Sequence, residues 1–297
     1  MQTKSLAIII LNYNNSSDTI ECLKSLSDNL SPKSYKIFLI DNSNAFCNEL
    51  NTYLSSIGIE LEYLFLERNS GFTEGNNIGI KKALIENFEH IMLLNNDTVV
   101  IDDSIEKANL LLQSSNVVDI IGLVNYYYSN KTRVWQCGLN QYIQCGLILK
   151  VKLNKENKIS YCDYVPGSSI IIKREVFKKI GLLDENFFAY FEEIDFCTRA
   201  KKENFKIAYI PHSKILHKVG AASINKQKLY LKMRNSLYFY SKHLSKWNFY
   251  ILFPKLVLKQ VIKALVHKKP FVNLKAVIIG YADYAKNNLG PGSVQSL

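Results

Sequence analysis

The stretch LAIIILNYN, residues 6–14, decides the fold of this chain. Its first six residues are apolar and leave no polar face, which predicts a strand buried on both sides of a sheet. Apolar residues then recur at near-helical spacing, at Ile20, Leu23, Leu26 and Leu30. A buried strand followed directly by a helix is the start of a parallel α/β unit.

The same alternation continues along the chain. Apolar runs predict strands at residues 35–40, 61–66, 90–94 and 117–123, with helical patterns between them at 46–56, 76–88 and 104–113. Further on, the pattern predicts antiparallel stretches at 126–128 and 142–152, strands at 169–172 and 206–210, and helices at 174–181, 190–204 and throughout 226–297. We therefore expect an α/β domain over 1–225, with a mostly parallel Rossmann-like sheet flanked by helices and a small antiparallel addition. Residues 226–297 should form a basic, aromatic-rich helical C-terminal region.

The composition excludes several classes of protein. The chain has 297 residues, 47% of them hydrophobic and 12% aromatic, which excludes intrinsic disorder. The apolar run at 6–11 is too short for a signal peptide, and the longest later candidate, 249–258, is interrupted by Pro254 and Lys255. We therefore expect no membrane-spanning helix. Six scattered cysteines without a Cys-x-x-Cys pair favour free thiols in a cytosolic protein.

Charge is distributed unevenly along the chain. Residues 201–297 contain 18 Lys and Arg against two acidic residues, a net charge of +16, whereas residues 1–200 carry a net charge of −5. A basic segment with interleaved aromatic residues suits nucleic acid or an anionic membrane surface. The aromatic and aliphatic residues of 247–253 either lie in a membrane interface or pack against the body or a second subunit, and both alternatives stay open.

Polar clusters follow four of the expected strands, at residues 12–14, 41–43, 68–72 and 95–97. In open α/β sheets, ligands bind beyond the carboxyl ends of the strands. The turn preference of Asn, Asp, Ser and Gly explains any one cluster. Four in succession predict a polar binding rim at one edge of the sheet.

Gly71, Gly75 and Gly79 form a G-x3-G-x3-G pattern at an expected strand-to-helix junction. Glycine at such a junction lets the backbone approach a phosphate near a helix N-terminus. The spacing matches neither the dinucleotide-binding G-x-G-x-x-G nor the G-K-[ST] of a P-loop. By itself the pattern is a weak signal.

Asp97 is an acidic residue at the tip of an expected buried strand. Hard divalent ions such as Mg²⁺ and Mn²⁺ take oxygen ligands and keep waters and substrate phosphates, so one aspartate and one distant histidine can be enough to hold one. The candidate partner is His217, which follows the expected strand at 206–210. The alternative for a lone histidine is an ordinary core or surface position.

The segment FAYFEEIDFCTR, residues 188–199, carries the strongest chemical signal. On a helix, Asp195 lies four residues before Arg199 and three after Glu192, which predicts a structural charged face. Glu193 instead projects over an apolar stripe, and we expect burial to raise its pKa. A raised pKa suits a general base that works near neutrality. The alternative is that Glu193 only borders the helix.

Together, these segments resemble the inverting glycosyltransferases of family 2, which have the GT-A fold, and look closest to the bacterial rhamnosyltransferase-like group. The resemblance runs from about residue 6 to about residue 240. Its motifs are NYN at 12–14, IDNS at 40–43, NSGFTEGNN at 69–77, LNNDT at 94–98, VPGS at 165–168, YFEEIDF at 190–196 and HKVG at 217–220. Each motif is short, but their order and spacing together are specific.

The resemblance implies a role for each matching residue. Asn12, Tyr13 and Asp41 match positions that hold the nucleotide base, and Asn69, Gly71 and Asn76 match the loop that lines the diphosphate-sugar. Asn95, Asn96 and Asp97 occupy the D-x-D position, where Asp97 matches the metal-binding acid. His217 matches a metal-associated histidine, and Glu193 matches the catalytic base. This chain keeps one acid of the D-x-D and has Glu where the family commonly has Asp.

The resemblance also implies the reaction and its partners. It implies that a sugar moves with inversion from a nucleoside-diphosphate-sugar to a glycan or lipid-linked glycan in bacterial surface polysaccharide synthesis, with Mg²⁺ or Mn²⁺ as cofactor. The expected location is cytoplasmic and peripheral on the inner face of the cell membrane, against an anionic surface. We expect no nucleic-acid partner, and a homodimer through the C-terminal region is the other expected use of its exposed aromatic residues.

Two other functions stay open at this point. A nucleotidyltransferase shares a related sheet and a metal, but it should show a basic glycine loop after the first strand, and residues 12–14 do not form one. A nucleic-acid binder would use the basic C-terminal region. No helix-turn-helix, zinc or RNP signature accompanies that region.

Overall fold

The computed structural model describes residues 5–32, 34–43, 45–114, 116–156, 158–219, 226–266 and 269–296. The expected boundary between residues 225 and 226 therefore falls at the edge of a segment, 220–225, that lies outside the described residues. Gly220, the last residue of the HKVG motif, lies outside them as well.

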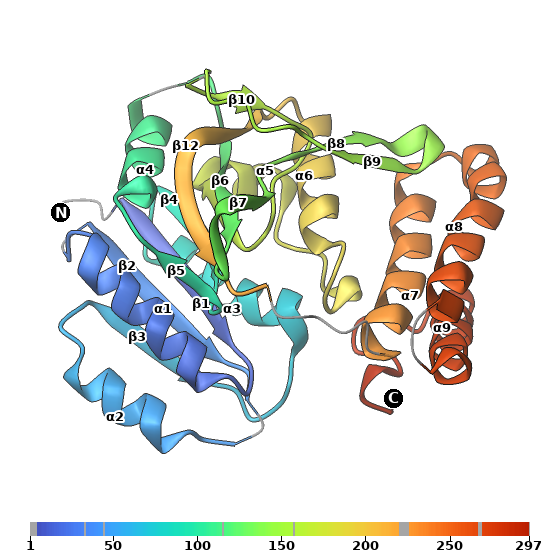
Figure 1. Ribbon diagram of the computed structural model, residues 1–297, viewed down its shortest axis with the longest axis horizontal. Helices are drawn as coiled ribbons and strands as arrows, with labels where there is room; N and C mark the ends of the chain where they lie inside the picture. The colour runs from blue at the N-terminus through green and yellow to red at the C-terminus, as the bar shows by residue number, and fades with distance from the viewer. Residues whose placement is uncertain are drawn as a thin grey trace.

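Ten strands of the described residues form one sheet (Figure 1). Its strands within residues 6–95 are all parallel to one another. The ten strands are β1 (Leu6–Asn12), β2 (Tyr35–Asp41), β3 (Leu61–Phe65), β4 (His90–Asn95), β5 (Thr98–Val100), β6 (Ile120–Tyr127), β7 (Asn130–Gln136), β10 (Ser160–Tyr161), β11 (Ser169–Lys173) and β12 (Ile207–His217). The order is β10-β12-β6-β11-β4-β1-β2-β3, with β5 paired to β12 and β7 to β6. Strand β11 runs antiparallel between β4 and β6, while β6 and β12 are parallel.

Helices cover both faces of this sheet, as the apolar first strand predicts. They are α1 (Ser16–Asn29), α2 (Asn48–Ser56), α3 (Gly71–Ile85), α4 (Ser104–Ser114), α5 (Arg174–Ile180) and α6 (Glu192–Lys202). Within β1, Ile9 enters one hydrophobic core and Ile8 and Ile10 enter the other. The expected α/β architecture is confirmed.

Helix α3 begins five residues earlier than the sequence pattern predicts, and two of its glycines allow it to pack closely on β1. A Cβ atom on Gly75 would lie 2.5 Å from Leu11, and one on Gly79 would lie 2.6 Å from Ile9. Contacts that short do not occur, so these two glycines serve helix-to-strand packing. Gly71 differs from them, since its φ of +78° is a conformation that favours glycine.

The antiparallel additions differ from the expected ones. Residues 126–128 do not form a separate strand, because Tyr126 and Tyr127 continue β6. The stretch at 142–152 belongs to a hairpin of its own, β8 (Leu139–Tyr142) and β9 (Leu147–Lys150), joined by the short helix η1 (Ile143–Cys145). Gly146, with a φ of +65°, turns the chain back after η1.

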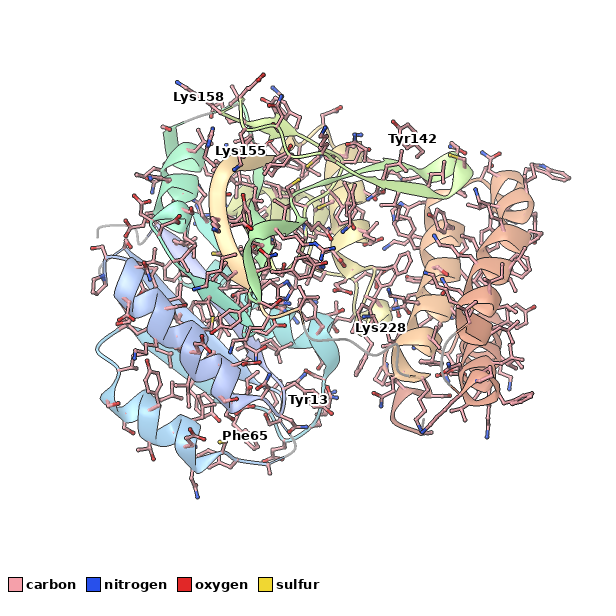
Figure 2. All side chains as sticks on the ribbon, viewed as in Figure 1. Tyr13, Phe65, Tyr142, Lys155, Lys158 and Lys228 are labelled. Atoms are coloured by element: carbon pink, nitrogen blue, oxygen red, sulfur yellow. The ribbon has the colours of Figure 1, made fainter. Side chains whose placement is uncertain are left out.

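The C-terminal region consists of three helices packed on one another, α7 (Lys226–His243), α8 (Lys246–Val266) and α9 (Pro270–Ala285), followed by the short helix η3 (Val294–Ser296). Figure 1 shows α7, α8 and α9 side by side at one end of the long axis, and Figure 2 labels Tyr142 of the hairpin close to them. Residues of α7 and α8 share a hydrophobic core with the sheet. None of the helices among the described residues combines the length and apolarity that crossing a bilayer requires.

The aromatic segment 247–253 is buried only in part. Phe249 and Leu252 are buried in the core, whereas Trp247, Tyr250 and Ile251 are exposed by 80%, 66% and 77%. All five residues belong to α8, so one face of this helix packs inward and the other is left uncovered.

Candidate active site

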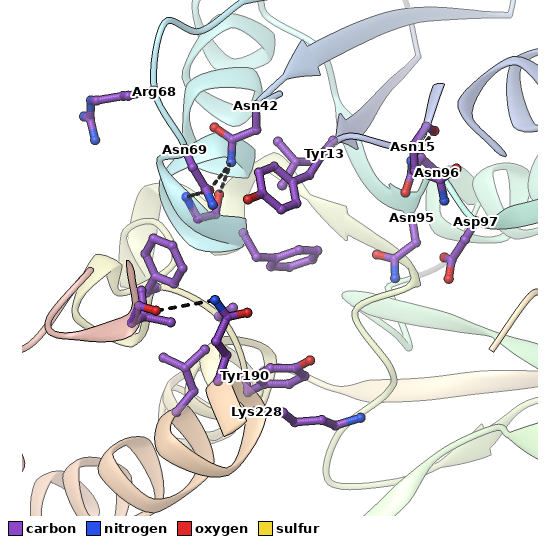
Figure 3. Close-up of a pocket in the computed structure, with 18 residues that line it drawn as sticks. Tyr13, Asn15, Asn42, Arg68, Asn69, Asn95, Asn96, Asp97, Tyr190 and Lys228 are labelled. Carbon is purple, nitrogen blue, oxygen red and sulfur yellow. Dashed lines mark hydrogen bonds between the residues drawn. The ribbon is translucent and has the colours of Figure 1, made fainter. Parts of the chain in front are cut away.

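A cavity of about 870 Å³ opens between the carboxyl edge of the sheet, the segment 188–190 and helix α7 (Figure 3). Its lining consists of Leu11, Tyr13, Asn15, Asn42, Arg68, Asn69, Gly71, Phe72, Asn95, Asn96, Asp97, Phe188, Ala189, Tyr190, Gln227, Lys228, Leu231 and Val294. All four polar clusters of the sequence contribute to this wall. A polar rim at one edge of the sheet is what the strand ends predict.

Asp97 and His217 meet at this rim because two short strands pair. In β5 and β12, Thr98 lies opposite His217, which brings the preceding residue, Asp97, next to the histidine. The Nε2 atom of His217 lies 3.1 Å from Oδ1 of Asp97. The amide of Lys218 donates to the carbonyl of Asp97 at 2.8 Å and fixes its backbone.

The Asp97–His217 pair fits a divalent metal ion. Oδ1 of Asp97 is buried and faces Nε2 of His217 but forms no well-aligned hydrogen bond, although carboxylate oxygens are strong acceptors. Two ligand atoms bound to one octahedral ion at about 2.1 Å lie roughly 3 Å apart, which matches the Asp97–His217 separation. No group of three or more His, Cys, Asp or Glu in the described part of the chain could hold a metal. An ion held here would have Asp97 and His217 as protein ligands and would take its other ligands from water and substrate oxygens.

Asn12, Asp41 and Asn96 form a buried hydrogen-bond network beneath the cavity. Asn12 Nδ2 donates to Asp41 Oδ1 at 2.9 Å, and Asp41 Oδ2 accepts from the hydroxyl of Tyr63 at 2.8 Å. Thr19 joins the network, because its Oγ1 donates to Asn12 Oδ1 and accepts from Asn96 Nδ2, each at 2.9 Å. Asn12 and Asp41 are fully buried and do not line the cavity, whereas Asn96 does.

The loop after β3 is shaped by asparagine side chains. Asn42 donates to the carbonyl of Gly71 at 2.9 Å and accepts from the amide of Ser70 at 2.9 Å. Asn69 accepts from the amide of Gly71, also at 2.9 Å. Asn69 and Gly71 line the cavity together with Tyr13, which is 47% exposed. Asn76 lies below the surface and donates to the carbonyl of Phe72 at 2.8 Å.

Glu193 lies in the first turn of α6, three residues after Tyr190, but it is not part of the cavity lining. Its Oε2 atom is buried without a hydrogen-bond partner. Burial raises the pKa of Glu193, as the sequence predicts. A Cβ atom on Gly167 would lie 3.3 Å from that of Glu193, so the backbone of the VPGS motif passes directly beside this residue.

Glu192, the neighbour of Glu193, is buried as well. Burial, followed by repulsion from the Glu193 carboxylate, raises the pKa of Glu192 well above its usual range. Because the two carboxyl groups are adjacent and buried, they titrate as a coupled pair. Asp195 behaves differently, since it pairs with Arg199 at 2.7 Å and has no exposed surface. Its structural role on the helix agrees with the sequence-based expectation.

The segment before α6 is held in an unusual conformation by helix α7. Phe188, Tyr190 and Phe191 have φ angles of +62°, +67° and +80°, in the left-handed region that side chains disfavour. The Nδ2 atom of Asn235 donates to the carbonyls of Phe187, Ala189 and Tyr190, each at 2.8 Å. The neighbouring Arg234, fully buried, donates to the carbonyl of Phe187 at 3.0 Å. The C-terminal region thus holds the residues that precede Glu193.

Sequence reasoning missed the contribution of the C-terminal region to the cavity. Gln227, Lys228 and Leu231 of α7 and Val294 of η3 line it. Figure 3 shows Lys228 beside Tyr190, with the 95–97 turn farther across the cavity. The available signal was the spacing of Lys228 and Lys232, which lie on the same face of a helix.

This chain is similar in sequence to known glycosyltransferases. Residues 4–237 match the model of the family described as glycosyltransferase like family 2. The low-salt glycan biosynthesis hexosyltransferase of Haloferax volcanii is 30% identical over 203 residues, which are 68% of this chain and 63% of that protein. The match thus spans less than two thirds of that relative.

Two further proteins are similar over most of this chain. The dTDP-rhamnosyl transferase RfbF of Shigella flexneri is 24% identical over 217 residues, 73% of this chain and 70% of that protein. Among solved structures, a mannosyltransferase from Pyrobaculum calidifontis in complex with GDP-Man and Mn²⁺ has a TM-score of 0.57 at 11% identity, covering 100% of this chain and 79% of that one. At that identity the likeness shows a common fold.

Proposed function

The chain belongs to the glycosyltransferases of family 2, with their GT-A fold, and to their rhamnosyltransferase-like group, and from this premise we propose that it is an inverting enzyme. In the proposed reaction a sugar moves from a nucleoside-diphosphate-sugar to a hydroxyl group of a glycan acceptor. The observation that supports it most strongly is the meeting of Asp97 and His217, 120 residues apart along the chain, at the rim of the cavity. Membership of this family also argues against a nucleotidyltransferase or a nucleic-acid binder.

We assign the donor to the sheet side of the cavity. Tyr13 lies exposed in the wall, where its ring can stack on the nucleotide base, and Asn69 and Gly71 form the wall farther along. Asn12 and Asp41 support Tyr13 from below. Asn76 holds the first turn of α3, through its bond to Phe72, under the diphosphate-sugar.

We assign the metal to Asp97 and His217, with Asn96 beside them. When bound there, Mg²⁺ or Mn²⁺ would supply Lewis acidity to the diphosphate oxygens as the leaving group gains negative charge. The chain itself fixes the two ligands through the pairing of β5 with β12 and orients Asn96 through Thr19.

We assign the general base to Glu193. An acceptor hydroxyl is a weak nucleophile until its proton is removed, and an ionised Glu193 can take that proton as the oxygen attacks the anomeric carbon. The bond from that carbon to the diphosphate breaks on the opposite side, and the nucleoside diphosphate leaves with the electron pair. One displacement of this kind inverts the anomeric centre. A hydrogen bond from Glu192 favours the ionised form of Glu193, because it lowers the pKa of Glu193 against the effect of burial.

We further propose that the acceptor is lipid-linked and that the protein works at the cytoplasmic face of an anionic membrane. The net charge of +16 in residues 201–297 and the exposed Trp247, Tyr250 and Ile251 support this location. Sedimentation at low salt with vesicles containing phosphatidylglycerol should carry the protein down, and pure phosphatidylcholine vesicles should not. A protein that stays in the supernatant with both, or that forms dimers through the same face, removes the membrane proposal.

The substitution Glu193→Gln tests the reaction. It keeps the size of the side chain but removes the base, so we expect kcat to fall by about 10²–10⁴ while the affinity for the donor is unchanged. Glu175→Gln on α5, which alters a half-exposed glutamate, serves as the matched control. Proton NMR of the glycoside product reports the anomeric configuration. Normal turnover of Glu193→Gln, or a retained configuration, contradicts the proposal.

A further inference from the structure

Four lysines of the C-terminal helices lie close enough to repel one another, and Lys228 among them lines the cavity; we call Lys228 and Lys232 of α7 and Lys259 and Lys263 of α8 the lysine cluster. Each pair is spaced by one helical turn. The Nζ atoms of Lys228 and Lys232 lie 5.7 and 5.8 Å from the centre of the Tyr190 ring. Lys228 also lines the cavity, on the opposite side from Asp97 in Figure 3. The lysine cluster therefore stands on the Glu193 side of the site.

The lysine cluster is assembled against its own repulsion. Burial, followed by the charges of the three other lysines, lowers the pKa of Lys232 to about 8. Burial also lowers the pKa of Lys228 and of Lys263, and Lys259 and Lys228 add to the shift of Lys263. The carboxylate that offsets these charges at Lys232 is that of Glu193. Such an arrangement destabilises the empty fold, and sites of this kind are usually kept for a ligand.

The surroundings of the lysine cluster indicate what the ligand is. On α8, Leu258, Ile262 and Leu265 form an exposed apolar stripe, with 58%, 50% and 53% of their surface accessible. Lys259 and Lys263 each follow a residue of this stripe by one position, so the lysines run along one side of it. A phosphoryl group offers several strong acceptor oxygens and more than one negative charge, and an attached hydrocarbon chain would cover the stripe.

We propose that the lysine cluster binds the phosphate or diphosphate group of a lipid-linked acceptor and so brings the acceptor hydroxyl to Glu193. This inference rests on the proposed function and adds to it a second anion position, separate from the donor diphosphate at Asp97 and His217. The phosphoryl group stays bonded to its lipid and sugar throughout. Its role is to position the acceptor.

The test uses farnesyl diphosphate, inorganic pyrophosphate and farnesol as probes. Titration calorimetry on the full chain, with EDTA and without a donor, measures their affinities without metal at Asp97. The double variant Lys232→Met/Lys263→Met keeps the apolar stems and removes two charges. We expect it to bind farnesyl diphosphate and pyrophosphate at least about tenfold more weakly than the wild type. Lys275→Met/Lys286→Met, at two exposed lysines outside the cluster, is the matched control and should bind as the wild type does.

Several results would overturn the inference. One is equal affinity of the cluster variant and the wild type for both phosphorylated probes, and another is wild-type binding of farnesol as tight as that of farnesyl diphosphate. A third is a cluster variant that loses binding to phosphatidylglycerol vesicles but keeps its affinity for farnesyl diphosphate, since the lysines would then serve lipid headgroups. The melting temperature should equal or exceed that of the wild type because the variant relieves repulsion, so misfolding would not account for lost affinity.

This test is separate from that of the proposed function. Glu193→Gln removes a negative charge next to Lys232, so it should bind farnesyl diphosphate as tightly as the wild type or more tightly. If the reaction is wrong and the lysine cluster right, the probes still bind but no sugar is transferred. If the reaction is right and the lysine cluster wrong, sugar transfer proceeds and the cluster variant keeps the wild-type affinity for both phosphorylated probes.

Discussion

The two sides of the cavity are built in different ways. On the sheet side, Asp97 and His217 are placed by backbone pairing, since Thr98 lies opposite His217 in the ladder of β5 and β12. On the helix side, the backbone before Glu193 is in a disfavoured conformation and is held by side chains of α7. A ladder tolerates the loss of any one side chain, whereas a strained segment relaxes when its anchor is removed.

This difference suits the division of labour that we propose. A donor with a fixed nucleotide and diphosphate is matched by a rigid rim, in which main-chain pairing sets the distances. An acceptor site shaped by the C-terminal helices can change its position with those helices, because the same residues that hold the segment 187–190 belong to α7. Substitutions on the two sides should therefore fail in different ways.

Among the substitutions that compare the two sides, Asp97→Asn at the rim is expected to have the largest effect. The backbone bond from Lys218 to the carbonyl of Asp97 does not involve the side chain, so the fold should persist. We expect kcat to fall by about 10²–10³ through loss of charge stabilisation at the leaving group. Mn²⁺ should raise the melting temperature of the wild type but not that of the variant, which thermal scans measure without turnover.

Asp103→Asn, a half-exposed position on the loop before α4, is the control for the rim substitution. It should keep both turnover and the response to Mn²⁺. If Mn²⁺ still stabilised Asp97→Asn, the ion would bind elsewhere, and Asp97 would not be its ligand on the sheet side.

The next effect is expected on the helix side, from Asn235→Ala. It removes the one amide group that donates to three carbonyls of the segment before Glu193, each at 2.8 Å. We expect a loss of about 1–3 kcal/mol in the free energy of unfolding and about a tenfold lower kcat, with the donor KM unchanged. Chemical denaturation and steady-state kinetics measure the two.

Asn248→Ala removes one exposed side-chain hydrogen bond, from the Asn248 amide to Gln144, and is the control for Asn235→Ala. It should change neither quantity. If Asn235→Ala lost stability without any change in kcat, or raised the donor KM as much as it lowered kcat, the segment before Glu193 would not be an acceptor-side element.

The sequence predicted the sheet side well because strand ends carry their own signal. An apolar run that stops at a polar cluster fixes both the strand and the edge, which is how Asp97 was found. His217 was predicted only as a distant partner that follows an expected strand at 206–210, whereas β12 continues as far as His217. It predicted the residues of the helix side less well. Helical periodicity showed that residues 226–243 form a helix, but it did not show that Lys228 faces a cavity or that Asn235 faces the segment 187–190. Those contacts depend on packing between distant parts of the chain.

The pattern also misjudged details where local and distant requirements differ. The glycines of α3 looked like a phosphate-binding signal, yet Gly75 and Gly79 are needed for packing on β1. The expected strand at 126–128 turned out to be the end of β6, since the tyrosines there are suited to strands of either kind. In both cases the sequence indicated a special residue type, but it did not show which part of the chain that residue packs against.

The smallest effect on activity is expected from Asp195→Asn, which tests whether the contact between α6 and α7 matters for stability alone. Asp195 has no exposed surface and pairs with Arg199, Lys242 and His243 at 2.7, 2.8 and 2.7 Å. These partners, led by the bond from His243, outweigh the opposing effect of burial and lower the pKa of Asp195 to about 2.

The sign of the pH dependence follows from that shift. Because the pKa of Asp195 is lower in the folded state than its usual 3.8, the carboxylate stabilises the fold above about pH 4, and this stabilisation is lost as the pH falls toward 2. The contribution is on the order of 2 kcal/mol. We expect Asp195→Asn to be less stable than the wild type by that amount at neutral pH, with the difference shrinking between pH 4 and pH 2 in acid titrations of unfolding.

Turnover separates the two sides of the cavity in this last variant. Asp195 touches α7 through Lys242 and His243, which lie beyond Asn235, so the segment 187–190 should keep its hydrogen bonds and kcat should change by less than a factor of about two. A large loss of kcat in a variant that is still folded would mean that Glu193 depends on the electrostatics of the α6–α7 contact as well as on the backbone anchored by Asn235. The helix side would then be a single coupled unit, in contrast to the rim, where the backbone pairing of β5 with β12 places Asp97 and His217.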